Sequence, residues 1–549
     1  MLRTARRKRH MTYDHIVVGG GTAGCVAASR LIQDHGARVL LLEAGGTHRR
    51  PYVGIPAGAF KMLFGKGNYL ERYQSVPQPS LDGRLVEIAQ GNLLGGGSSV
   101  NAMTYMRGLA SDYDRWDAQL GGAGWAWRDL LPYFSRHEAN DRLKGPAHGA
   151  SGPLHVQDQR YICKTADLFL ETMQRLGVPL RDDFNAGETG GVGYTQITAV
   201  NGRRCSAANA FLDPLRGDRR LTIRLGAQAV RILLDGKRAV GIRYLENGMV
   251  REARCEGEIL LAAGAYISPK LLMLSGIGPA DHLGALGVTV VSDLPGVGQG
   301  MQDHNMVPVM ALCRPGFGYH REDRGWRLAR NLVRYGLRRR GPLASNGSES
   351  LAFVNLEDPS AEPNLQIYCM GFLPPGVADS PGMMLCPTLI RPASTGWMRL
   401  RSADPLDKPL ISPNFFSDPK DLERMLRGVR HCRDIMNSAP LSGVVTQEIA
   451  PGGAATSDEA LAAFCRASTF TNYHPVGSCR MGREEDSMAV VDRDLQVRGI
   501  QGLRVCDASV IPTIPGANTN APVMVIADRC VDLMMGGSSS AKPSGGDLG

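Results

Sequence analysis

The sequence predicts an α/β protein that contains a βαβ nucleotide-binding unit. Two stretches carry this prediction: a strand, glycine loop, helix and strand in register over residues 15–43, and a second glycine-rich loop at residues 91–108. The composition agrees, because 43% of the 549 residues are hydrophobic and 21% are charged, as is typical of a globular enzyme with a large core. A chain of this length has room for more than one domain.

The first stretch, YDHIVVGGGTAGCVAASRLIQDHGARVLLLEAG, predicts a dinucleotide site. The apolar run 16–18 is typical of a buried parallel strand, and Gly19, Gly21 and Gly24 follow it in the G-x-G-x-x-G spacing. A helix and a second apolar strand come next, and that strand ends in Glu43. The glycines let the backbone approach a pyrophosphate at a helix N-terminus, and Glu43 can accept hydrogen bonds from ribose hydroxyls. An ordinary βαβ unit without a ligand is the alternative.

The second glycine loop distinguishes between cofactors. An acid at the end of the second strand favours an unphosphorylated ribose, and therefore NAD or FAD over NADP. The loop GNLLGGGSSVNAMTYMRG at 91–108 adds Ser98, Ser99 and Asn101 as polar contacts. An NAD site has no evident need for this loop, whereas FAD, with a pyrophosphate and a large tricyclic ring, does. The sequence therefore favours FAD.

The net charge of +9 has local sources, a basic cluster in the first ten residues and the run RGWRLARNLVRYGLRRRG at 324–341. No recognisable nucleic-acid-binding module accompanies this charge, so we expect no nucleic-acid partner. Two interpretations of the run at 324–341 stay open. It is either a solvated helix with an arginine-rich face, or a peripheral contact with an anionic membrane that gives access to a quinone.

The cysteines and the chain ends carry further expectations. The twelve cysteines are scattered without a C-x-x-C pair or zinc-type spacing, so we expect reduced thiols, a cytoplasmic location and no metal site. No stretch has the length of a membrane span. Residues 1–10 and 536–549 are expected to be flexible tails.

Local patterns later in the chain predict a strand and two helices. The segment GWMRLRS at 396–402 is strand-like. A helix is expected to open at Asp418 and Pro419, with one apolar face. A second helix is expected to open with a capping box formed by Thr456 and Glu459.

Five ordered segments resemble the glucose–methanol–choline (GMC) family of FAD-dependent oxidoreductases. Residues 91–108 match the family's first signature and GAYISPKLLMLSGIG, 264–278, matches its second. LPGVGQGMQDH at 294–304 and TNYHPVGSCRMG at 471–482 are similar to two further family segments, with single departures at Met301 and Ser478. VCDASVIPTIPGANTNAP, 505–522, resembles the C-terminal FAD segment.

The resemblance implies a doubly wound, Rossmann-like FAD domain interleaved with an α+β substrate domain built on an antiparallel sheet. The segments then expected are 11–155 (FAD domain, first part), 156–220 (connecting and substrate-domain segment), 221–310 (FAD domain, second part), 311–465 (substrate domain) and 466–535 (C-terminal FAD and catalytic part).

The resemblance also implies the residues that contact FAD: Gly19, Gly21, Gly24, Glu43, Gly95, Ser99, Asn101, Val230, Asp507, Ala508 and Asn520. Some members attach FAD covalently through a histidine just before the asparagine of the first signature. Here that position is Val100, so non-covalent FAD is expected. Asn520 is also expected to cap the final helix, with Pro522 in its first turn.

Within this resemblance, His474 corresponds to the base that takes the hydroxyl proton of an alcohol while hydride leaves for flavin N5. Asn518 corresponds to a second residue that hydrogen-bonds the same oxygen. A base is needed because hydride loss from a neutral alcohol would leave a protonated carbonyl, and imidazole titrates near working pH. A packed structural histidine is the alternative for His474. His304 is expected to be structural, holding a loop through hydrogen bonds.

Glu349 matches a glutamate that faces the cationic head group in choline-oxidising members, and it is the candidate substrate contact. The same glutamate also occurs in members with uncharged substrates. We therefore expect an uncharged primary alcohol or polyol, with choline or another quaternary amine as one alternative and a flavin-containing lyase without net redox change as another. A dehydrogenase is favoured over an oxidase. The electron acceptor stays open among a quinone, another acceptor and O2.

Overall fold

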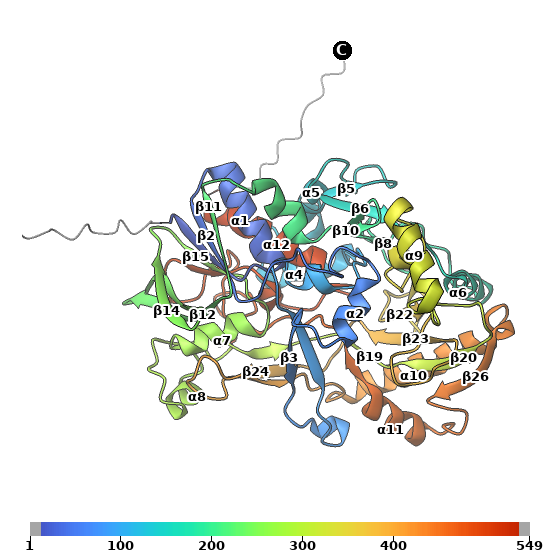
Figure 1. Cartoon of the computed structure of the whole chain (residues 1–549). Helices are drawn as coiled ribbons and strands as arrows, with labels where there is room; N and C mark the ends of the chain where they lie inside the picture. Colours follow the sequence, from blue (N-terminus) through green and yellow to red (C-terminus); the bar gives the residue numbers. More distant parts are fainter. Residues whose placement is uncertain (1–12, 537–549) are drawn as a thin grey trace, which may run out of the picture.

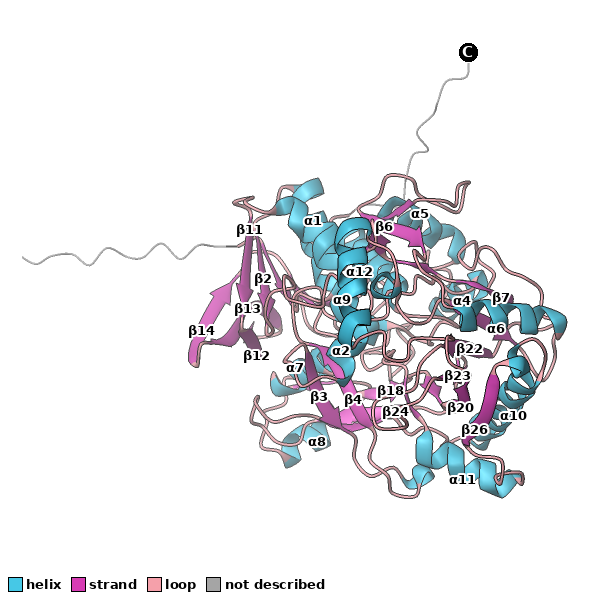
Figure 2. Ribbon diagram, turned by 45° about the vertical axis from the view of Figure 1, so that its right-hand side comes forward, coloured by secondary structure: helices cyan, strands magenta, loops and turns pink. Residues whose placement is uncertain are grey.

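The computed structural model describes residues 13–536 and places them in one body with two sheets as its main layers (Figure 1). The predicted tails, 1–10 and 536–549, lie outside the described residues except for Gly536. Helices and strands are mixed throughout residues 13–536, and Figure 2 distinguishes them by colour.

The first sheet has five parallel strands in the order β11-β2-β1-β15-β28. This is the order of a doubly wound nucleotide-binding sheet. The chain places β2 and then β11 on one side of β1, and later adds β15 and β28 on the other side. The strands are β1 (His15–Val18), β2 (Val39–Glu43), β11 (Leu221–Leu225), β15 (Ile259–Leu261) and β28 (Leu503–Val505).

Helices α1 (Thr22–His35) and α12 (Asn520–Met534) pack against each other beside this sheet (Figure 1). An antiparallel unit of β12 (Ala227–Asp235), β13 (Arg238–Glu246) and β14 (Met249–Arg254) also contacts the sheet, and α7 (Ile267–Leu274) packs on β12. The N-cap of α12 is Thr519 and carries no side-chain capping bond. The predicted cap at Asn520 is therefore wrong by one residue.

The second sheet has eight antiparallel strands along the path β26-β20-β23-β22-β21-β7, with β19 and β27 paired at its side. Helices α6 (Lys164–Arg175) and α10 (Pro419–Asn437) pack on one face. The strands are β7 (Gly191–Tyr194), β19 (Asn305–Met306), β20 (Val309–Cys313), β21 (Ser350–Val354), β22 (Leu365–Met370), β23 (Gly382–Leu389), β26 (Val445–Ala450) and β27 (Phe470–Thr471). Together with the parallel sheet, this arrangement confirms the predicted fold class.

Side chains of the second sheet alternate between two cores, as the period of two along a strand requires. Leu351, Phe353 and Tyr368 belong to a separate apolar cluster that also contains Ala517. Their neighbours Ala352 and Ile367 belong to the main core. The face that bears Tyr368 is thus turned toward the C-terminal segment 517–518.

The local predictions for the second half of the chain are mostly confirmed. Strand β24 (Gly396–Arg399) lies within the predicted segment, and Asp418 caps α10 by accepting a hydrogen bond from the backbone N–H of Lys420 at 2.9 Å. Helix α11 (Asp458–Ser468) is capped by Ser457, which accepts from Ala460 N–H, so the capping box predicted from Thr456 is wrong.

Further helices are α2 (Gly58–Phe64), α3 (Gly97–Val100), α4 (Ala110–Leu120), α5 (Trp127–His137), α8 (Ala280–Ala285) and α9 (Gly325–Arg338). Further strands are β3 (Leu70–Gln74), β4 (Glu87–Gly91), β5 (Glu138–Asn140), β6 (Leu154–Asp158), β8 (Gln196–Ile197), β9 (Ala199–Val200), β10 (Arg203–Arg204), β16 (Ile277–Gly278), β17 (Ser292–Asp293), β18 (Gln299–Met301) and β25 (Leu410–Ser412).

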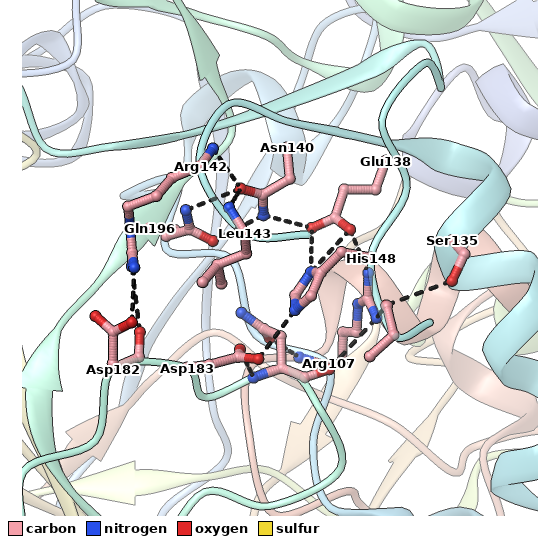
Figure 3. Close-up of polar contacts among 12 residues, drawn as sticks. Arg107, Ser135, Glu138, Asn140, Arg142, Leu143, His148, Asp182, Asp183 and Gln196 are labelled. Atoms are coloured by element: carbon pink, nitrogen blue, oxygen red, sulfur yellow. Dashed lines mark hydrogen bonds and ion pairs between the residues drawn. The ribbon is translucent and has the colours of Figure 1, made fainter. Parts of the chain in front are cut away.

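A buried polar network joins loops that are distant in sequence (Figure 3). Glu138 accepts from Arg107 Nη2 at 2.7 Å, and both side chains are fully buried. His148 lies between two carboxylates, with Nδ1 at 3.1 Å from Glu138 and Nε2 at 2.9 Å from Asp183 (Figure 3). Burial alone would lower the pKa of His148, but hydrogen bonds to Asp183 and Glu138 raise the pKa to about 9. The network therefore holds a charged histidine at neutral pH.

Candidate active site

The two glycine loops meet at the carboxyl end of β1. Gly95 N–H donates to the carbonyl of Gly20 at 2.7 Å, so the loops touch directly. Gly19 has φ = 101°, and a Cβ there would lie 2.5 Å from the carbonyl oxygen of Ala262. A Cβ on Gly24 would lie 1.9 Å from the carbonyl oxygen of Gly19, which explains why the third glycine is needed for the helix to pack on the strand.

At the N-termini of the two helices that follow these loops, the space in front of the backbone is free of other atoms. A Cβ on Gly21, the N-cap of α1, would come no closer than 3.8 Å to another atom, and one on Gly97 would meet nothing within 4 Å. Free backbone N–H groups at a helix N-terminus with open space in front suit a pyrophosphate. The residues present therefore fit a dinucleotide such as FAD.

The two predicted adenosine contacts, Glu43 and Val230, lie on strands β2 and β12. Glu43, at the end of β2, accepts backbone hydrogen bonds from Gly20 at 2.8 Å and Gly45 at 2.7 Å, which fixes its carboxyl group beside the first glycine loop. Burial raises the pKa of Glu43. Val230 lies in a bulge of β12, where the register passes from Ala229 to Arg231 and leaves Val230 without a partner residue opposite it in β13. Its backbone is thus outside the strand ladder.

The C-terminal segment joins this site through side-chain contacts. Asp507 is buried, and its Oδ2 accepts from Gly264 N–H at 2.8 Å while its Oδ1 accepts from Ser509 N–H at 2.9 Å. The carbonyl of Ala508 accepts from Gly477 N–H at 3.2 Å. Asn520 Oδ1 accepts from the hydroxyl of Thr22 at 2.9 Å, which leaves its amide N–H groups available at the start of α12.

Arg204 holds the second glycine loop and was not singled out by sequence reasoning. Its buried guanidinium donates to Oδ1 and to the carbonyl of Asn101, both at 2.7 Å, and to the carbonyl of Val53 at 2.8 Å. Oδ1 of Asn101 also accepts from Met103 N–H at 3.0 Å, so its amide N–H groups are the part left to contact a ligand. No carboxylate contacts Arg204 among the residues described, and burial lowers its pKa to about 9.

Ser99 is fully buried in the same loop, and its hydroxyl donates to the carbonyl of Leu94 at 2.8 Å. Gly95 has φ = 88°, and a Cβ there would lie 2.2 Å from Oγ of Ser99. The close approach of Ser99 therefore leaves no room for a side chain at position 95.

His474 and Asn518, which are 44 positions apart, come together in the structure. Nδ2 of Asn518 lies 3.2 Å from Nε2 of His474. The hydroxyl of Tyr368, on β22, lies 3.3 Å from Oδ1 and 3.2 Å from Nδ2 of Asn518. Because an amide NH2 can only donate, Nε2 of His474 is the acceptor and keeps a lone pair. Burial lowers the pKa of His474 to about 3, so the ring is neutral at pH 7.

His304 contacts the ring of His474 directly. The two Nδ1 atoms are 3.0 Å apart and the rings lie at 87° to each other. With Nε2 of His474 as acceptor, its proton is on Nδ1 and is donated to Nδ1 of His304. Burial lowers the pKa of His304 most, and repulsion from a protonated His474 lowers the pKa further. The main-chain carbonyl of His304 also accepts from Asn472 N–H at 2.7 Å, so the residue fixes both the ring and the loop.

Asp303 fixes the turn that carries His474. It is buried, accepts from His474 N–H at 2.9 Å, and accepts from the hydroxyl of Thr471. Burial raises the pKa of Asp303 to about 7. Tyr473, between these partners, has φ = 61°, a strained value for a residue with a side chain. The side chain of Asp303 therefore holds the tight turn that carries His474.

Glu349 lies apart from this pair. Its side chain is fully buried and contacts the hydroxyls of Tyr319 and Ser345, and the thiol of Cys163 at 3.3 Å. Burial raises the pKa of Glu349. Both carboxyl oxygens thus have protein donors, and none of these donors is a basic side chain.

Within residues 13–536, no group of histidine, cysteine, aspartate and glutamate is arranged to hold a metal ion. No described helix combines the length and the apolarity that crossing a bilayer requires. The twelve cysteines, all in this part of the chain, are free thiols, and all except Cys255 are buried.

A parallel nucleotide-binding sheet with two touching glycine loops, joined to an antiparallel substrate sheet, defines a flavin-type oxidoreductase. The chain belongs to the GMC oxidoreductase family: the family's N-terminal model matches residues 13–306 and its C-terminal model matches residues 392–527. This confirms the family predicted from the five sequence segments.

Known proteins are similar over nearly the full length. An "Alcohol dehydrogenase (acceptor)" of Pseudomonas putida is 37% identical over 537 residues, covering 95% of this chain and 96% of that protein. The mitochondrial choline dehydrogenase of Homo sapiens is 37% identical over 541 residues, covering 95% of this chain and 90% of that protein.

Among solved structures, pyridoxine 4-oxidase from Mesorbium loti has a TM-score of 0.85 and 32% identity, covering 94% of this chain and 98% of the other. Formate oxidase of Aspergillus oryzae, in a structure concerned with FAD modification, has a TM-score of 0.90 and 27% identity, covering 97% of this chain and 99% of the other.

Proposed function

We propose that this GMC oxidoreductase oxidises an uncharged primary alcohol or polyol to the aldehyde or ketone. FAD, when bound, supplies the acceptor for the hydride at its N5 atom. Gly19, Gly21 and Gly24 would hold its pyrophosphate, and Glu43 would hold its ribose. The observation that carries the proposal is the contact between neutral His474 and Asn518 at 3.2 Å, within a fold that holds two glycine loops.

His474 is the base in this proposal. Its Nε2 lone pair takes the hydroxyl proton, so that the carbon can lose hydride without forming a protonated carbonyl. Nδ2 of Asn518 donates to the same oxygen and stabilises the negative charge that develops there. Such a base contributes about 10²- to 10⁴-fold to the rate. The hydroxyl of Tyr368 contacts the Asn518 amide and holds its plane beside His474.

The substitution His474→Ala tests this role. FAD content should be unchanged, and the anaerobic bleaching of flavin absorbance by an alcohol should slow about 10²-fold or more. His431→Ala is a matched control, because His431 is a partly buried histidine of α10 whose Nε2 has no hydrogen-bond partner in the described residues. A bleaching rate in His474→Ala equal to that of the control would remove His474 from the mechanism.

The low pKa of His474 also predicts the pH dependence. A group whose pKa is about 3 stays neutral throughout the working range, so the rate of bleaching should be flat on the acidic side down to about pH 5. A rate that falls as the pH drops through about 6.5 would show an ordinary histidine pKa and contradict the proposed environment.

The choice of an uncharged substrate rests on Glu349. A carboxyl group that is buried and already hydrogen-bonded by Tyr319 and Ser345 is poorly placed to pair with a quaternary ammonium. Anaerobic titration with primary alcohols, polyols and choline separates the alternatives. Bleaching by choline at lower concentration than by any uncharged alcohol would favour the choline reaction, and no bleaching across the panel would favour a lyase without net redox change.

For the electron acceptor we favour a quinone or a similar organic acceptor over O2, reached through a peripheral membrane contact. Support comes from the Pseudomonas putida relative, whose name specifies an acceptor-dependent alcohol dehydrogenase. Anaerobically bleached protein exposed to air should recover its absorbance slowly, and should recover quickly when a soluble quinone is added. Fast recovery in air alone would make the protein an oxidase.

A further inference from the structure

Helix α9 is anchored to the protein by polar groups rather than by its apolar face. Asn331 and Tyr335 are its buried residues. The hydroxyl of Tyr335 donates to the carbonyl of Gly202 at 3.0 Å, and Nδ2 of Asn331 donates to the carbonyl of Glu322 at 2.9 Å. In an ordinary surface helix the apolar residues take this inward position.

Most large apolar side chains of α9 point outward instead, and only Leu328 is half-buried. Leu337 is 80% exposed, Trp326 is 68% exposed and Val333 is 61% exposed. Residues 326, 333 and 337 are seven and four positions apart, which is about two turns and one turn, so they form one stripe along the helix. Leu332, 50% exposed, widens the stripe. A stripe of this kind leaves apolar area in water unless something covers it.

Arginines border the stripe. From Gly325 to Arg340 the sequence has six arginines and no acidic residue. Arg330 pairs with Glu322 at 2.9 Å and also stacks on Trp326 at 4.9 Å. Arg334 and Arg338 make no ion pair among the residues described here. The helix therefore combines an apolar face with a cationic border that is only partly neutralised.

The acidic side chains near the N-terminal end of α9 already form ion pairs with basic residues. Glu322 pairs with Arg330 at 2.9 Å and lies 3.7 Å from Arg327, and Asp323 pairs with Lys61 of α2 at 2.7 Å. Asp379 pairs with Arg321 at 2.9 Å. These pairs leave the C-terminal half of α9 as the region of uncompensated positive charge.

Helix α2 lies beside α9 on the outside of the molecule (Figure 1, Figure 2). The ion pair between Lys61 and Asp323 joins α2 to the segment that leads into α9. Phe64, at the end of α2, is itself an exposed large apolar residue. The helix next to α9 thus also carries an exposed aromatic side chain.

We propose that α9 is an interfacial helix that binds the surface of an anionic phospholipid membrane. Trp326, Val333 and Leu337 enter the boundary between head groups and acyl chains, while the arginines contact the phosphates. A second copy of this chain fits the same surface less well, because a two-fold contact would bring two sets of arginines together. The inference goes beyond alcohol oxidation, and it gives the proposed quinone-dependent reaction a place next to a lipid-soluble acceptor.

Co-sedimentation of the FAD-loaded protein with vesicles tests the proposal without using catalysis. The vesicles are phosphatidylcholine alone or phosphatidylcholine mixed with phosphatidylglycerol, at low and high salt. We expect binding to the mixed vesicles at low salt. The double variant Trp326→Ser/Leu337→Ser should lose it, and Arg334→Gln/Arg338→Gln should weaken binding to mixed vesicles by roughly fivefold per arginine.

The matched control is Met249→Ser/Val250→Ser on β14, where both residues are exposed to a similar degree but have no arginine-flanked helix. This variant should bind like the wild type, and all variants should keep the flavin spectrum. Failure of the wild type to bind mixed vesicles at low salt overturns the proposal, as does equal binding by all variants. A dimer that becomes a monomer in Trp326→Ser/Leu337→Ser would overturn it in favour of a protein interface.

Vesicle binding and anaerobic bleaching test the membrane proposal and the alcohol-oxidation proposal independently. Loss of vesicle binding with normal anaerobic bleaching by an alcohol would leave the oxidation chemistry intact and remove the membrane surface. Normal vesicle binding without bleaching by any alcohol would leave the membrane surface intact and remove the proposed alcohol oxidation.

Discussion

Replacing His304 with alanine removes the ring nitrogen that lies 3.0 Å from Nδ1 of His474. In the wild-type protein this contact keeps the proton of the neutral His474 ring on Nδ1 and leaves Nε2 free to act as a base. Without it, only the Asn518 amide still favours this tautomer, and a ring that carries its proton on Nε2 cannot accept the hydroxyl proton. His304 is therefore a positioning residue for His474.

The expected loss follows from the environment of the two rings. His304 is fully buried and burial lowers its pKa, so the contact joins two uncharged groups. Its removal leaves a buried N–H of His474 unsatisfied, at a cost of about 1–3 kcal/mol. Since about 1.4 kcal/mol is a factor of ten in a rate constant, anaerobic bleaching of the flavin should slow roughly 5- to 150-fold.

Two further variants at the same position separate hydrogen bonding from packing. His304→Asn keeps an oxygen acceptor with a smaller side chain, and His304→Phe keeps the ring volume without an acceptor. Stopped-flow absorbance under anaerobic conditions, with FAD content measured in parallel, should rank His304→Asn faster than His304→Phe. The reverse order, or a wild-type rate in His304→Phe, would refute the reasoning and leave His304 with a packing role.

Three other predictions concern the cofactor and the buried network. Arg204→Met should lower FAD retention on desalting about tenfold or more, because Asn101 loses its buried donor, whereas the exposed Arg203→Met should not. The FAD released by acid precipitation should appear in the supernatant, and a yellow pellet would instead show a covalent bond. The stability contributed by His148 should be fully present below about pH 6.5 and be lost as the pH rises through its folded pKa of about 9, so thermal melting temperatures should fall more steeply above pH 7 in the wild type than in His148→Asn. Equal slopes would mean that the ring is not held in its charged form by Glu138 and Asp183.

Several features of the fold followed from the sequence because they depend on neighbours along the chain. The run 16–18, the glycine spacing and the acid at Glu43 occupy one continuous βαβ unit, and each residue acts within that unit. Asp418 and Pro419 likewise open α10 as predicted, since a cap depends on residues one to three positions away. The capping prediction at Asn520 was wrong because that side chain bonds Thr22 of another helix instead.

Features that depend on contacts between distant segments did not follow from the sequence. His304 and His474 are 170 positions apart, and the motif around His304 gave only a loop-holding role. Arg204 was not singled out at all, because its importance comes from its hydrogen bonds to Asn101, which is distant in the sequence. Glu349 could be matched to a family position, but its burial among Tyr319 and Ser345 depends on how two loops fold over β21.

By itself, then, the sequence determined the nucleotide-binding unit and the order of the family's five segments. It also identified His474 and Asn518 as candidate catalytic residues. The tertiary structure decided which atoms meet and which faces are covered. Helix α9 shows the difference most directly, since its periodicity at 324–341 gives an amphipathic helix in either orientation. Periodicity specifies which residues share a face of the helix. Which face packs against the protein depends on the groups that the rest of the fold presents there. In this fold Asn331 and Tyr335 find buried partners there, and the apolar face is left outside.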